Sequence, residues 1–338
     1  MKANAFHAVI LAGGPGRRFW PWSTPQAPKH ALPLLPGGLS LFEDTVRRLR
    51  LLVPYDRLWL VTTRAQAKSL RRLAPGLRTS RILAEPEARD TAAAIGLAAL
   101  RIARLDPDAV MAVCPADHRI APAQVFARQI RRAAAVAASQ DLLMTLGVKP
   151  DRPATSYGYL QPGKRLGGDI RALARFHEKP GAARARRYLG AGFLWNSGIF
   201  VWKASVLLDA LARHAPDIHV ALGRLGADLK GYGLIPKRSI DYAVMEKASN
   251  AAVLPASFSW SDWGTWAAWE ASLKADRAGN RIFGNARLDA CRGVTAVGAD
   301  PSRPLILSGA KGLLVVQAPS GTLVSDRSRT EAIKTLVP

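Results

Sequence analysis

The chain has 338 residues, 49% of them hydrophobic, and it carries 48 lysines and arginines against 25 aspartates and glutamates, a formal net charge of +23. This length exceeds the usual size of a single core, so we expect one large domain and one smaller domain. No apolar run approaches the roughly 18 residues that span a bilayer. The two cysteines, Cys114 and Cys291, form no C-x-x-C pair. These features exclude a membrane-spanning protein, argue against a zinc site or disulfide framework, and predict a reducing, cytoplasmic location.

The positive charge is spread along the chain. Basic pairs such as Arg47-Arg48, Arg71-Arg72 and Arg131-Arg132 fall on expected helices, without a block of five or six cations and without interleaved aromatic residues. The distribution favours solvated, arginine-rich helix surfaces over an RNA-binding surface. A charge of this size would still attract substrates that carry several phosphates.

The first half of the chain alternates short β-rich runs with helical patterns, which is typical of βαβ units and a mostly parallel sheet. The expected strands are 6–11, 57–62, 81–84, 109–114 and 142–148, and the expected helices are 41–52, 65–73, 91–104 and 122–139. The pattern then becomes less regular, with strands expected near 157–161, 170–177 and 198–203 and helices near 205–213 and 240–248.

A domain boundary is expected at residues 275–280, where charged and turn-forming residues cluster. Beyond it, β-like runs at 305–307, 313–316 and 322–324 are separated by turns that contain Ser-Gly. We therefore expect two domains, residues 1–274 and a small β-rich domain at residues 275–338. The absence of a clean internal repeat argues against a long hexapeptide β-helix.

Residues 11–33, LAGGPGRRFWPWSTPQAPKHALP, contain the most informative motif. An apolar run leads into a turn with Gly13, Gly14 and Gly16, where missing Cβ atoms let backbone N–H groups approach phosphate oxygens. Fixed cations follow at Arg17, Arg18 and Lys29. A Walker loop is absent, and Phe19 stands where a dinucleotide fingerprint needs glycine. The glycines alone leave two interpretations open, a polyphosphate site and an ordinary basic strand-to-helix turn.

Further motifs follow in order along nearly the whole chain. They are EPEARDTAAAIGLAA at 85–99, PADH at 115–118, YGY at 157–159, FHEKP at 176–180, LWNSGIF at 194–200, SIDYAVMEK at 239–247 and FSWSDWGTW at 258–266. With L-A-G-G-x-G-x-R-x-W-P and P-K, this series resembles the sugar-1-phosphate nucleotidyltransferases, and Trp20-Pro21 with Pro28-Lys29 is similar to the mannose-1-phosphate guanylyltransferase branch. The resemblance implies a Rossmann-like α/β domain, with a mostly parallel mixed sheet flanked by helices, and a short C-terminal β-rich domain.

The resemblance also implies a function. Such an enzyme transfers GMP from GTP to α-D-mannose 1-phosphate by in-line attack on the α-phosphorus, uses Mg²⁺, and releases GDP-mannose and pyrophosphate. The implied catalytic residues are Arg18, Lys29, Asp117 and Asp262, the two aspartates being the metal ligands. The implied nucleotide-binding residues are Leu11, Ala12, Gly13, Gly14, Gly16, Arg17, Glu85, Thr91 and Asp117, and the implied sugar-phosphate residues are Gly158, Glu178, Lys179, Asn196 and Asp241.

The residue types themselves suit these roles to different degrees. Asp117 follows an expected strand at the end where open α/β sheets bind ligands, and Mg²⁺ prefers carboxylate and phosphate oxygens. Asp262 has a second interpretation, as the N-cap of a helix that begins at Trp263, and Asp241 equally reads as a helix start. Lys179, taken alone, reads as a solvated loop residue. The tryptophans at 260, 263, 266 and 269 recur every three residues, which favours a helical packing stripe over a base-stacking platform.

The base and the sugar call for different chemistry. A carboxylate at Glu85 can accept from both the N1–H and the 2-amino group of guanine, although a glutamate before Pro86 can also be an exposed loop residue. Glu178 can accept from sugar hydroxyls, Asn196 can both donate and accept, and Gly158 leaves room for the sugar.

Some positions depart from the usual family pattern. They are His30, Asp90-Thr91-Ala92-Ala93 and Trp263, and none of them removes a charged catalytic group. The expected partners are GTP and mannose 1-phosphate, with a homodimer as the candidate assembly and with no specific nucleic acid or membrane partner. The alternatives are transfer to another sugar 1-phosphate or from another nucleotide, a noncatalytic nucleotide-sugar-binding protein, and an RNA-binding protein.

Overall fold

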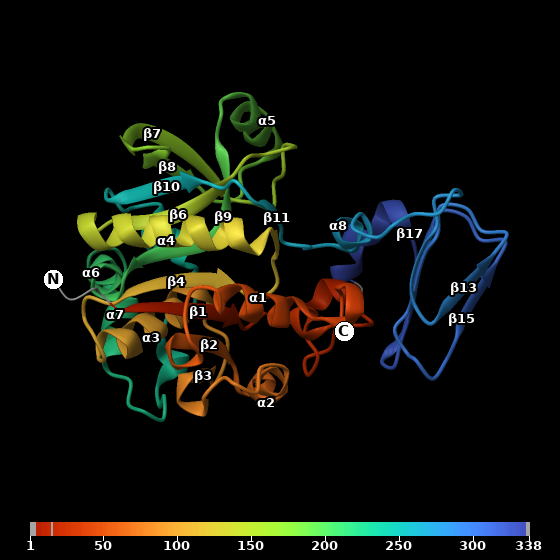
Figure 1. Ribbon diagram of the computed structural model, residues 1–338, viewed down its shortest axis with the longest axis horizontal. Helices are drawn as coiled ribbons and strands as arrows, with labels where there is room; N and C mark the ends of the chain where they lie inside the picture. The colour runs from red at the N-terminus through yellow and green to blue at the C-terminus, as the bar shows by residue number, and fades with distance from the viewer. Residues whose placement is uncertain (1–4, 15, 336–338) are drawn as a thin grey trace. The chain divides into compact units, whose positions relative to one another are not determined.

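The computed structural model describes residues 5–14 and 16–335, and within them the chain forms two compact units (Figure 1). Unit 1 contains the residues up to Gly13 together with 43–116 and 120–260. Unit 2 contains 14–42, 117–119 and the residues from Ser261 onward. Unit 2 is therefore discontinuous in sequence. The division into domains 1–274 and 275–338 stays a prediction.

Unit 1 is built on one large mixed sheet with the strand order β3-β2-β1-β4-β9-β6-β10-β8-β7. Its strands are β1 (Phe6–Ala12), β2 (Leu58–Thr63), β3 (Ile82–Glu85), β4 (Val110–Pro115), β6 (Leu143–Val148), β7 (Tyr159–Gly167), β8 (Ile170–His177), β9 (Leu194–Lys203) and β10 (Ala251–Pro255). Within this sheet β8 and β9 run against the other strands, so the sheet is mixed but mostly parallel. The expected fold class is confirmed.

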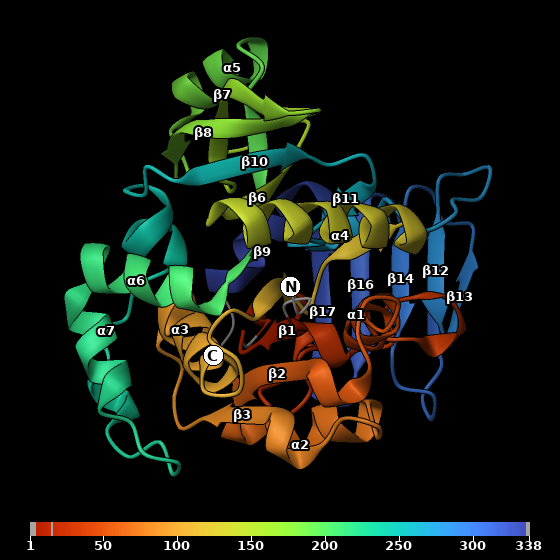
Figure 2. The same ribbon diagram turned by 60° about the vertical axis from the view of Figure 1, so that its left-hand side comes forward.

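Helices cover this sheet because their apolar faces match its buried strands. They are α1 (Leu41–Leu49), α2 (Arg64–Leu73), α3 (Asp90–Ala103), α4 (Ala123–Gln140), α5 (Ala182–Gly190), α6 (Ala204–His214) and α7 (Pro216–Gly223). Figure 2 shows α3, α6 and α7 side by side, and all three pack on one another. Their shared core includes Ile95, Leu207 and Leu222, and Val9 and Val113 of the sheet belong to the same cluster. The alanine-rich sequence of α3 permits this close packing.

Unit 2 has its own core and its own β-structure. Its strands are β12 (Arg281–Gly284), β13 (Ala286–Asp289), β14 (Thr295–Gly298), β15 (Leu305–Ser308), β16 (Leu313–Ala318) and β17 (Gly321–Asp326). Strands β12, β14 and β16 are parallel and β17 closes this sheet antiparallel, while β13 and β15 form a separate parallel pair. Trp263, Trp266 and Trp269 pack with Phe19 and Trp22 in the core. The small β-rich element expected near the C-terminus is therefore present.

The tryptophan series does not form one helical stripe. Helix α8 covers only Trp266–Glu270, Trp263 precedes it with φ at +39°, and Trp260 lies in the short strand β11 (Ser259–Ser261). The expected packing role is right for Trp263, Trp266 and Trp269, which are buried. The expected helix is wrong for the two N-terminal members, because the backbone turns before it becomes helical.

The early strands and helices lie within a few residues of their expected positions, and β8 has the expected bounds 170–177. The helix expected at 240–248 is instead a short π-helical segment, Asp241–Met245. Helices α5 and α7, strands β10 to β14, and the short strand β5 (Arg119–Ala121) were not expected. No described helix combines the length and apolarity that crossing a membrane requires.

Candidate functional site

Several of the expected residues lie at one edge of the unit 1 sheet, where parallel strands end. Strands β1 and β4 are parallel, with Leu11 opposite Pro115, and the Ala116 N–H donates to the Leu11 carbonyl at 2.9 Å. Strand β3 runs in the same direction and ends at Glu85. Open α/β sheets bind ligands at the carboxyl ends of their strands. Leu11 and Ala12 end β1 here, and Gly13 follows them.

The glycine turn in unit 2 is tightly built. Gly16 has φ at +66°, and a Cβ there would lie 2.6 Å from the Lys29 backbone nitrogen, so a larger residue cannot replace it without displacing Lys29. The Gly16 carbonyl accepts from the Phe19 N–H at 3.1 Å and from the Ser23 hydroxyl at 2.8 Å. Around Gly14, by contrast, the Cβ position has no neighbouring atom within 4 Å. The side chain of Arg17 lies outside the described part of the chain.

Lys29 is the centre of the charged cluster in unit 2. Its buried ammonium lies 2.6 Å from Asp117 Oδ2 and donates to the backbone carbonyls of Asp262 at 2.7 Å and of Trp263 at 3.3 Å. One cation thus joins segments that are more than 200 residues apart in sequence. The structure therefore brings together three of the four expected catalytic residues, Lys29, Asp117 and Asp262.

The cluster fixes protonation states as well as positions. Desolvation raises the pKa of Asp117, but Lys29 and His118 act more strongly in the other direction and hold that pKa well below its usual range. Asp117 is therefore ionised at every physiological pH. Burial lowers the pKa of the adjacent His30 to about 4, so that imidazole is neutral at pH 7. The ion pair of Asp117 with Lys29 is consequently a permanent feature.

Asp262 does not cap a helix. Its Oδ1 accepts from the Gly264 N–H at 3.0 Å, and the helix N-cap is Thr265, whose hydroxyl accepts from the Ala268 N–H at 3.2 Å. The capping interpretation of Asp262 is therefore wrong. Arg18, the remaining expected catalytic residue, donates to the Gly264 carbonyl at 3.3 Å, which places its guanidinium in the same turn.

The donor set of this turn fits a magnesium ion that is shared with a substrate. Among the described residues no group of three or more His, Cys, Asp or Glu side chains is arranged to hold a metal. Mg²⁺ is commonly bound by one or two carboxylates together with substrate phosphates, rather than by a cage of protein ligands. Asp117 and Asp262 are two carboxylates of that kind, and the Lys29 ammonium contacts the Asp117 carboxylate and the backbone carbonyl of Asp262.

Glu85 is buried, so the exposed-loop interpretation is wrong. Its side chain has 3% relative exposure, and Oε1 accepts from the Tyr232 hydroxyl at 2.5 Å. Oε2 faces Gly13, where an added Cβ would lie 3.3 Å from it. Burial raises the pKa of Glu85 to about 7, against the opposing effect of the Tyr232 hydrogen bond. The carboxyl group is thus poised between its two protonation states at neutral pH.

The expected sugar-phosphate residues form a second cluster in unit 1. Asn196 Nδ2 donates to Asp241 Oδ1 at 2.9 Å, and Glu178 forms an ion pair with Lys179. A Cβ on Gly158 would lie 2.6 Å from Glu178 Oε2, so the glycine leaves that carboxylate its place. Lys179 has φ at +44°, an unusual backbone conformation for a residue with a side chain.

Asp241 begins the π-helical segment without capping it. Burial, followed by the negative charge of Glu178, raises the pKa of Asp241 to about 7. The Tyr242 N–H donates instead to the Ser239 hydroxyl at 3.3 Å. The side chain of Asp241 therefore contacts Asn196 and does not cap the segment. The alternative interpretation of Asp241, as a capping residue, is wrong. Thr91 has a structural contact too, because its hydroxyl accepts from the Ile240 N–H at 2.8 Å.

Two polar partners could not be predicted from the sequence. Tyr232 contacts Glu85 across 147 residues, and Thr145 donates to Asn196 Oδ1 at 3.2 Å. Neither lies in a recognisable motif. A buried tyrosine needs a partner for its hydroxyl, but the sequence gives no means of choosing which carboxylate.

These features define an α/β protein with a buried carboxyl group at the sheet edge of unit 1 and, in unit 2, an ionised carboxylate paired with a buried lysine. The model of the family described as nucleotidyl transferase matches residues 7–278. The chain belongs to this nucleotidyl transferase family, whose members are enzymes.

Individual relatives agree with that assignment. The chain is 35% identical to a mannose-1-phosphate guanylyltransferase of Sinorhizobium fredii, over 97% of this chain and 66% of the relative. It is 36% identical to the xanthan biosynthesis protein XanB of Xanthomonas campestris, over 97% of this chain and 72% of that protein. The crystal structure of a protein named mannose-1-phosphate geranyltransferase, from Thermus thermophilus, matches with a TM-score of 0.88 and 32% identity over 98% of both chains. The chain thus spans about two thirds to three quarters of the length of the first two relatives, and nearly the full length of the solved structure.

Proposed function

We propose that this chain transfers GMP from GTP to α-D-mannose 1-phosphate, with release of pyrophosphate, and so serves GDP-mannose biosynthesis. The observation that carries the proposal is the contact of one buried lysine, Lys29, with both Asp117 and the Asp262–Trp263 peptide. Relatives at 35% and 36% identity that are named mannose-1-phosphate guanylyltransferase support the choice of substrates.

The reaction is a displacement at the α-phosphorus of GTP. A phosphate oxygen of the sugar phosphate forms the new P–O bond, and the bond to the β-phosphate oxygen breaks, so that pyrophosphate leaves. Such transfers need little covalent help from the protein, and catalysis is mainly positioning and charge stabilisation. Lys29 and Arg18 are the cations that bind the triphosphate and stabilise the charge that gathers on pyrophosphate. The backbone N–H groups near Gly13, Gly14 and Gly16 assist, because glycine lets phosphate approach the backbone closely.

Asp117 and Asp262 would hold the magnesium ion. When bound, Mg²⁺ supplies charge neutralisation on the phosphate oxygens. The protein prepares for this in two ways. The pKa of Asp117 is held below its usual range, so the ligand needs no deprotonation, and the Gly264 N–H fixes one oxygen of Asp262.

Glu85 reads the base, and Tyr232 positions Glu85. The ionised carboxylate accepts from the two hydrogen-bond donors on the Watson–Crick edge of guanine. The Tyr232 hydroxyl uses one lone pair of Oε1 and thereby fixes the plane of the carboxylate, which leaves further acceptor sites on both oxygens. Adenine presents an unprotonated N1 at that edge, so its acceptor would face the carboxylate.

Lys179 binds the phosphate of the sugar phosphate, and Glu178, Asn196 and Asp241 read its hydroxyl groups. Asn196 is oriented from both ends of its amide, by Asp241 and by Thr145. A fixed amide of this kind discriminates between hydroxyl configurations, because a misplaced hydroxyl leaves a buried polar group unpaired.

The setting of the reaction is part of the same proposal. Cys114 and Cys291 are both free and buried, which supports a reducing cytoplasmic location. A homodimer remains the candidate assembly.

One assay tests the function directly. Pyrophosphate release is measured across a panel of nucleoside triphosphates and sugar 1-phosphates, and the highest kcat/KM is expected for GTP with mannose 1-phosphate. A higher value with another pair would reassign the substrates. Absence of pyrophosphate release with every pair, in a protein that binds nucleotide sugars, would favour a noncatalytic sensor.

A further inference from the structure

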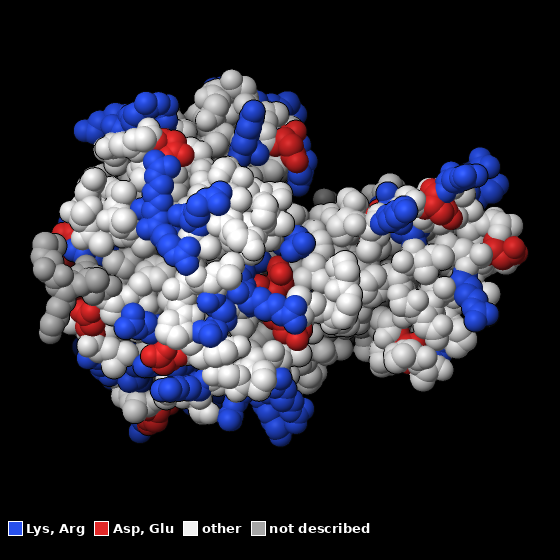
Figure 3. All heavy atoms as spheres, in the orientation of Figure 1, with Lys and Arg blue, Asp and Glu red and all other residues white. Residues whose placement is uncertain are grey.

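Helix α4 carries a group of arginines that the proposed reaction does not use. Arg128, Arg131 and Arg132 are spaced three and four residues apart, so they share one face of the helix. Figure 3 shows Lys and Arg side chains gathered over α4 on the face in view. A cavity of about 460 Å³ lies beside them and is lined by the three arginines with Gln129, Asp169 and Ser257. This volume is within the range of small-molecule sites.

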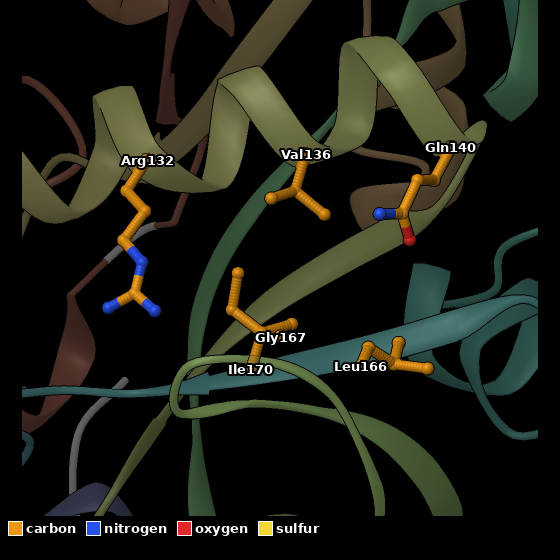
Figure 4. A pocket seen from close by; sticks show the side chains of 6 residues that line it. All are labelled: Arg132, Val136, Gln140, Leu166, Gly167 and Ile170. Atoms are coloured by element: carbon orange, nitrogen blue, oxygen red, sulfur yellow. The ribbon is translucent and has the colours of Figure 1, made fainter.

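A second hollow lies on α4 beside the first. It has a volume of about 200 Å³ and shares Arg132 with the larger cavity. Its other lining residues are Val136, Gln140, Leu166, Gly167 and Ile170. Figure 4 shows Arg132, Val136 and Gln140 on successive turns of α4, directed toward the β7–β8 hairpin. The basic cavity therefore lies beside a smaller one that has both polar and apolar lining residues, the apolar ones being Val136, Leu166 and Ile170.

Hydrogen bonds and an ion pair hold the residues that line the basic cavity. The buried side chain of Gln129 donates to the Pro255 carbonyl at 2.8 Å and accepts from the Ser257 N–H at 2.9 Å. The turn of the β7–β8 hairpin contacts Arg132 at two residues. Arg132 forms an ion pair with Asp169, and a Cβ on Gly168 would overlap the Arg132 guanidinium. A wall held in this way loses little conformational freedom when a ligand binds.

The cavity also has an excess of positive charge. Asp169 pairs with Arg132, and Arg131 donates to the Leu51 carbonyl, which neutralises no charge. Within the described ranges, 5–14 and 16–335, Arg128 has neither a hydrogen bond nor an ion pair in the structure. Three guanidinium groups against one carboxylate leave an excess of two positive charges at the cavity. Like charges at this helical spacing repel one another, and an anion between them relieves the repulsion.

We propose that the two adjoining cavities form a binding site for a small organic phosphate, with the phosphate dianion against Arg128 and Arg132 and the apolar part against Val136 and Leu166. Guanidinium groups bind phosphate with paired hydrogen bonds, which makes arginine better suited to this task than lysine. The site shares no residue with the proposed catalytic, nucleotide or sugar-phosphate sets. Its occupancy is therefore independent of the proposed transfer reaction.

The test uses phenyl phosphate, with inorganic phosphate and phenol as fragments, in calorimetric titrations of the full chain. Phenyl phosphate is expected to saturate one site and to bind about tenfold more tightly than inorganic phosphate, because only the ester fills both cavities. Hydrogen exchange should slow in residues 123–140. The double variant Arg128→Gln/Arg132→Gln should lose about tenfold in affinity for both phosphates, and Val136→Thr should weaken only phenyl phosphate.

The matched control is Arg186→Gln/Arg187→Gln, which removes the same charge from two exposed positions on α5. Its phosphate affinity should be unchanged, and both double variants should keep wild-type kcat/KM for GTP and mannose 1-phosphate. Equal losses in the two double variants, or no saturable binding, would show that these arginines are merely a solvated surface and would overturn the proposal. So would displacement of phenyl phosphate by RNA or anionic vesicles at far lower phosphate concentration than by inorganic phosphate. A chain without transferase activity could still pass this test, so the two proposals fail separately.

Discussion

Three carboxyl groups of the candidate sites, Asp117 in unit 2 and Glu85 and Asp241 in unit 1, differ in electrostatic character. In unit 2, Asp117 is paired with a buried lysine, and its pKa lies well below the usual range. In unit 1, Glu85 and Asp241 have neutral partners, Tyr232 and Asn196, and burial raises the pKa of each to about 7. The same kind of side chain is thus a permanent anion in one unit and a titratable hydrogen-bonding group in the other.

In the proposed reaction, this difference would match two tasks. Holding cations and phosphates requires a charge that never varies, and a close ammonium provides it. Recognition of a base or a sugar depends on directed hydrogen bonds to neutral groups, for which burial and fixed geometry are needed as well as the right protonation state. We therefore expect substitutions in the unit 2 cluster to affect turnover most, and substitutions in unit 1 to affect substrate choice.

The largest effect is expected for Asp117→Asn. The substitution keeps the volume of the side chain but removes the charge that binds Lys29 and the proposed metal, so kcat should fall by about a hundredfold or more. Steady-state kinetics at saturating Mg²⁺ measure it. Asp262→Asn should lower kcat to a similar extent, whereas Asp289→Asn, at an exposed position in β13, serves as the control and should behave as wild type. Near wild-type turnover of either test variant would remove that residue from the metal site.

A second comparison sets Lys29 against Lys179. Lys29 is buried and bound on three sides, whereas the Lys179 side chain is 60% exposed. We expect Lys29→Ala to lower kcat by roughly a hundredfold, because fixed cations contribute most where charge develops. Lys179→Ala should chiefly raise KM for mannose 1-phosphate, by roughly tenfold. A change in KM for GTP alone in Lys179→Ala would contradict this division of roles.

Much of the unit 1 fold follows from local sequence patterns. Runs such as residues 6–12 are largely apolar because both faces of a central strand are buried. Glycines between such runs indicate turns, and alanine-rich stretches indicate helices. The site was harder to predict. Asp117 could be proposed because it follows an expected strand at the end where open α/β sheets bind ligands, whereas Glu85 was proposed from the family resemblance and from the hydrogen-bond donors of guanine.

The contacts that determine chemistry were not predictable in this way. Lys29 binds the backbone carbonyls at 262 and 263, and the Glu85 partner is a tyrosine from a different part of the chain. Both contacts depend on tertiary packing between distant segments. Unit 2 itself is assembled from three separate stretches, which no local change in composition reveals.

Base choice should respond to Glu85 and more weakly to Tyr232. Glu85→Gln replaces one acceptor by a donor, so the preference for GTP over ATP should fall by roughly 1–3 kcal/mol. Tyr232→Phe removes only the hydroxyl that orients the carboxylate, and a smaller loss, about 1 kcal/mol, is expected. The measurement is the ratio of kcat/KM for GTP and ATP, and KM for mannose 1-phosphate serves as the internal control. If Glu85→Gln leaves the ratio unchanged, backbone groups or another side chain must read the base.

The smallest effect is a pH dependence of the same ratio. With a pKa of about 7, Glu85 is protonated at pH 6 and ionised at pH 8, and the ionised fraction rises about tenfold between them. Because only the carboxylate accepts from both guanine donors, the preference for GTP over ATP should rise severalfold over this interval, and Glu85→Gln should abolish the rise. Unfolding cannot produce the same trend. A carboxyl group whose pKa is raised on folding destabilises the fold as pH increases from 4.5 to about 7, so its contribution to stability is larger at pH 6 than at pH 8. A ratio that stays flat in the wild type would mean that Glu85 binds guanine in one protonation state throughout.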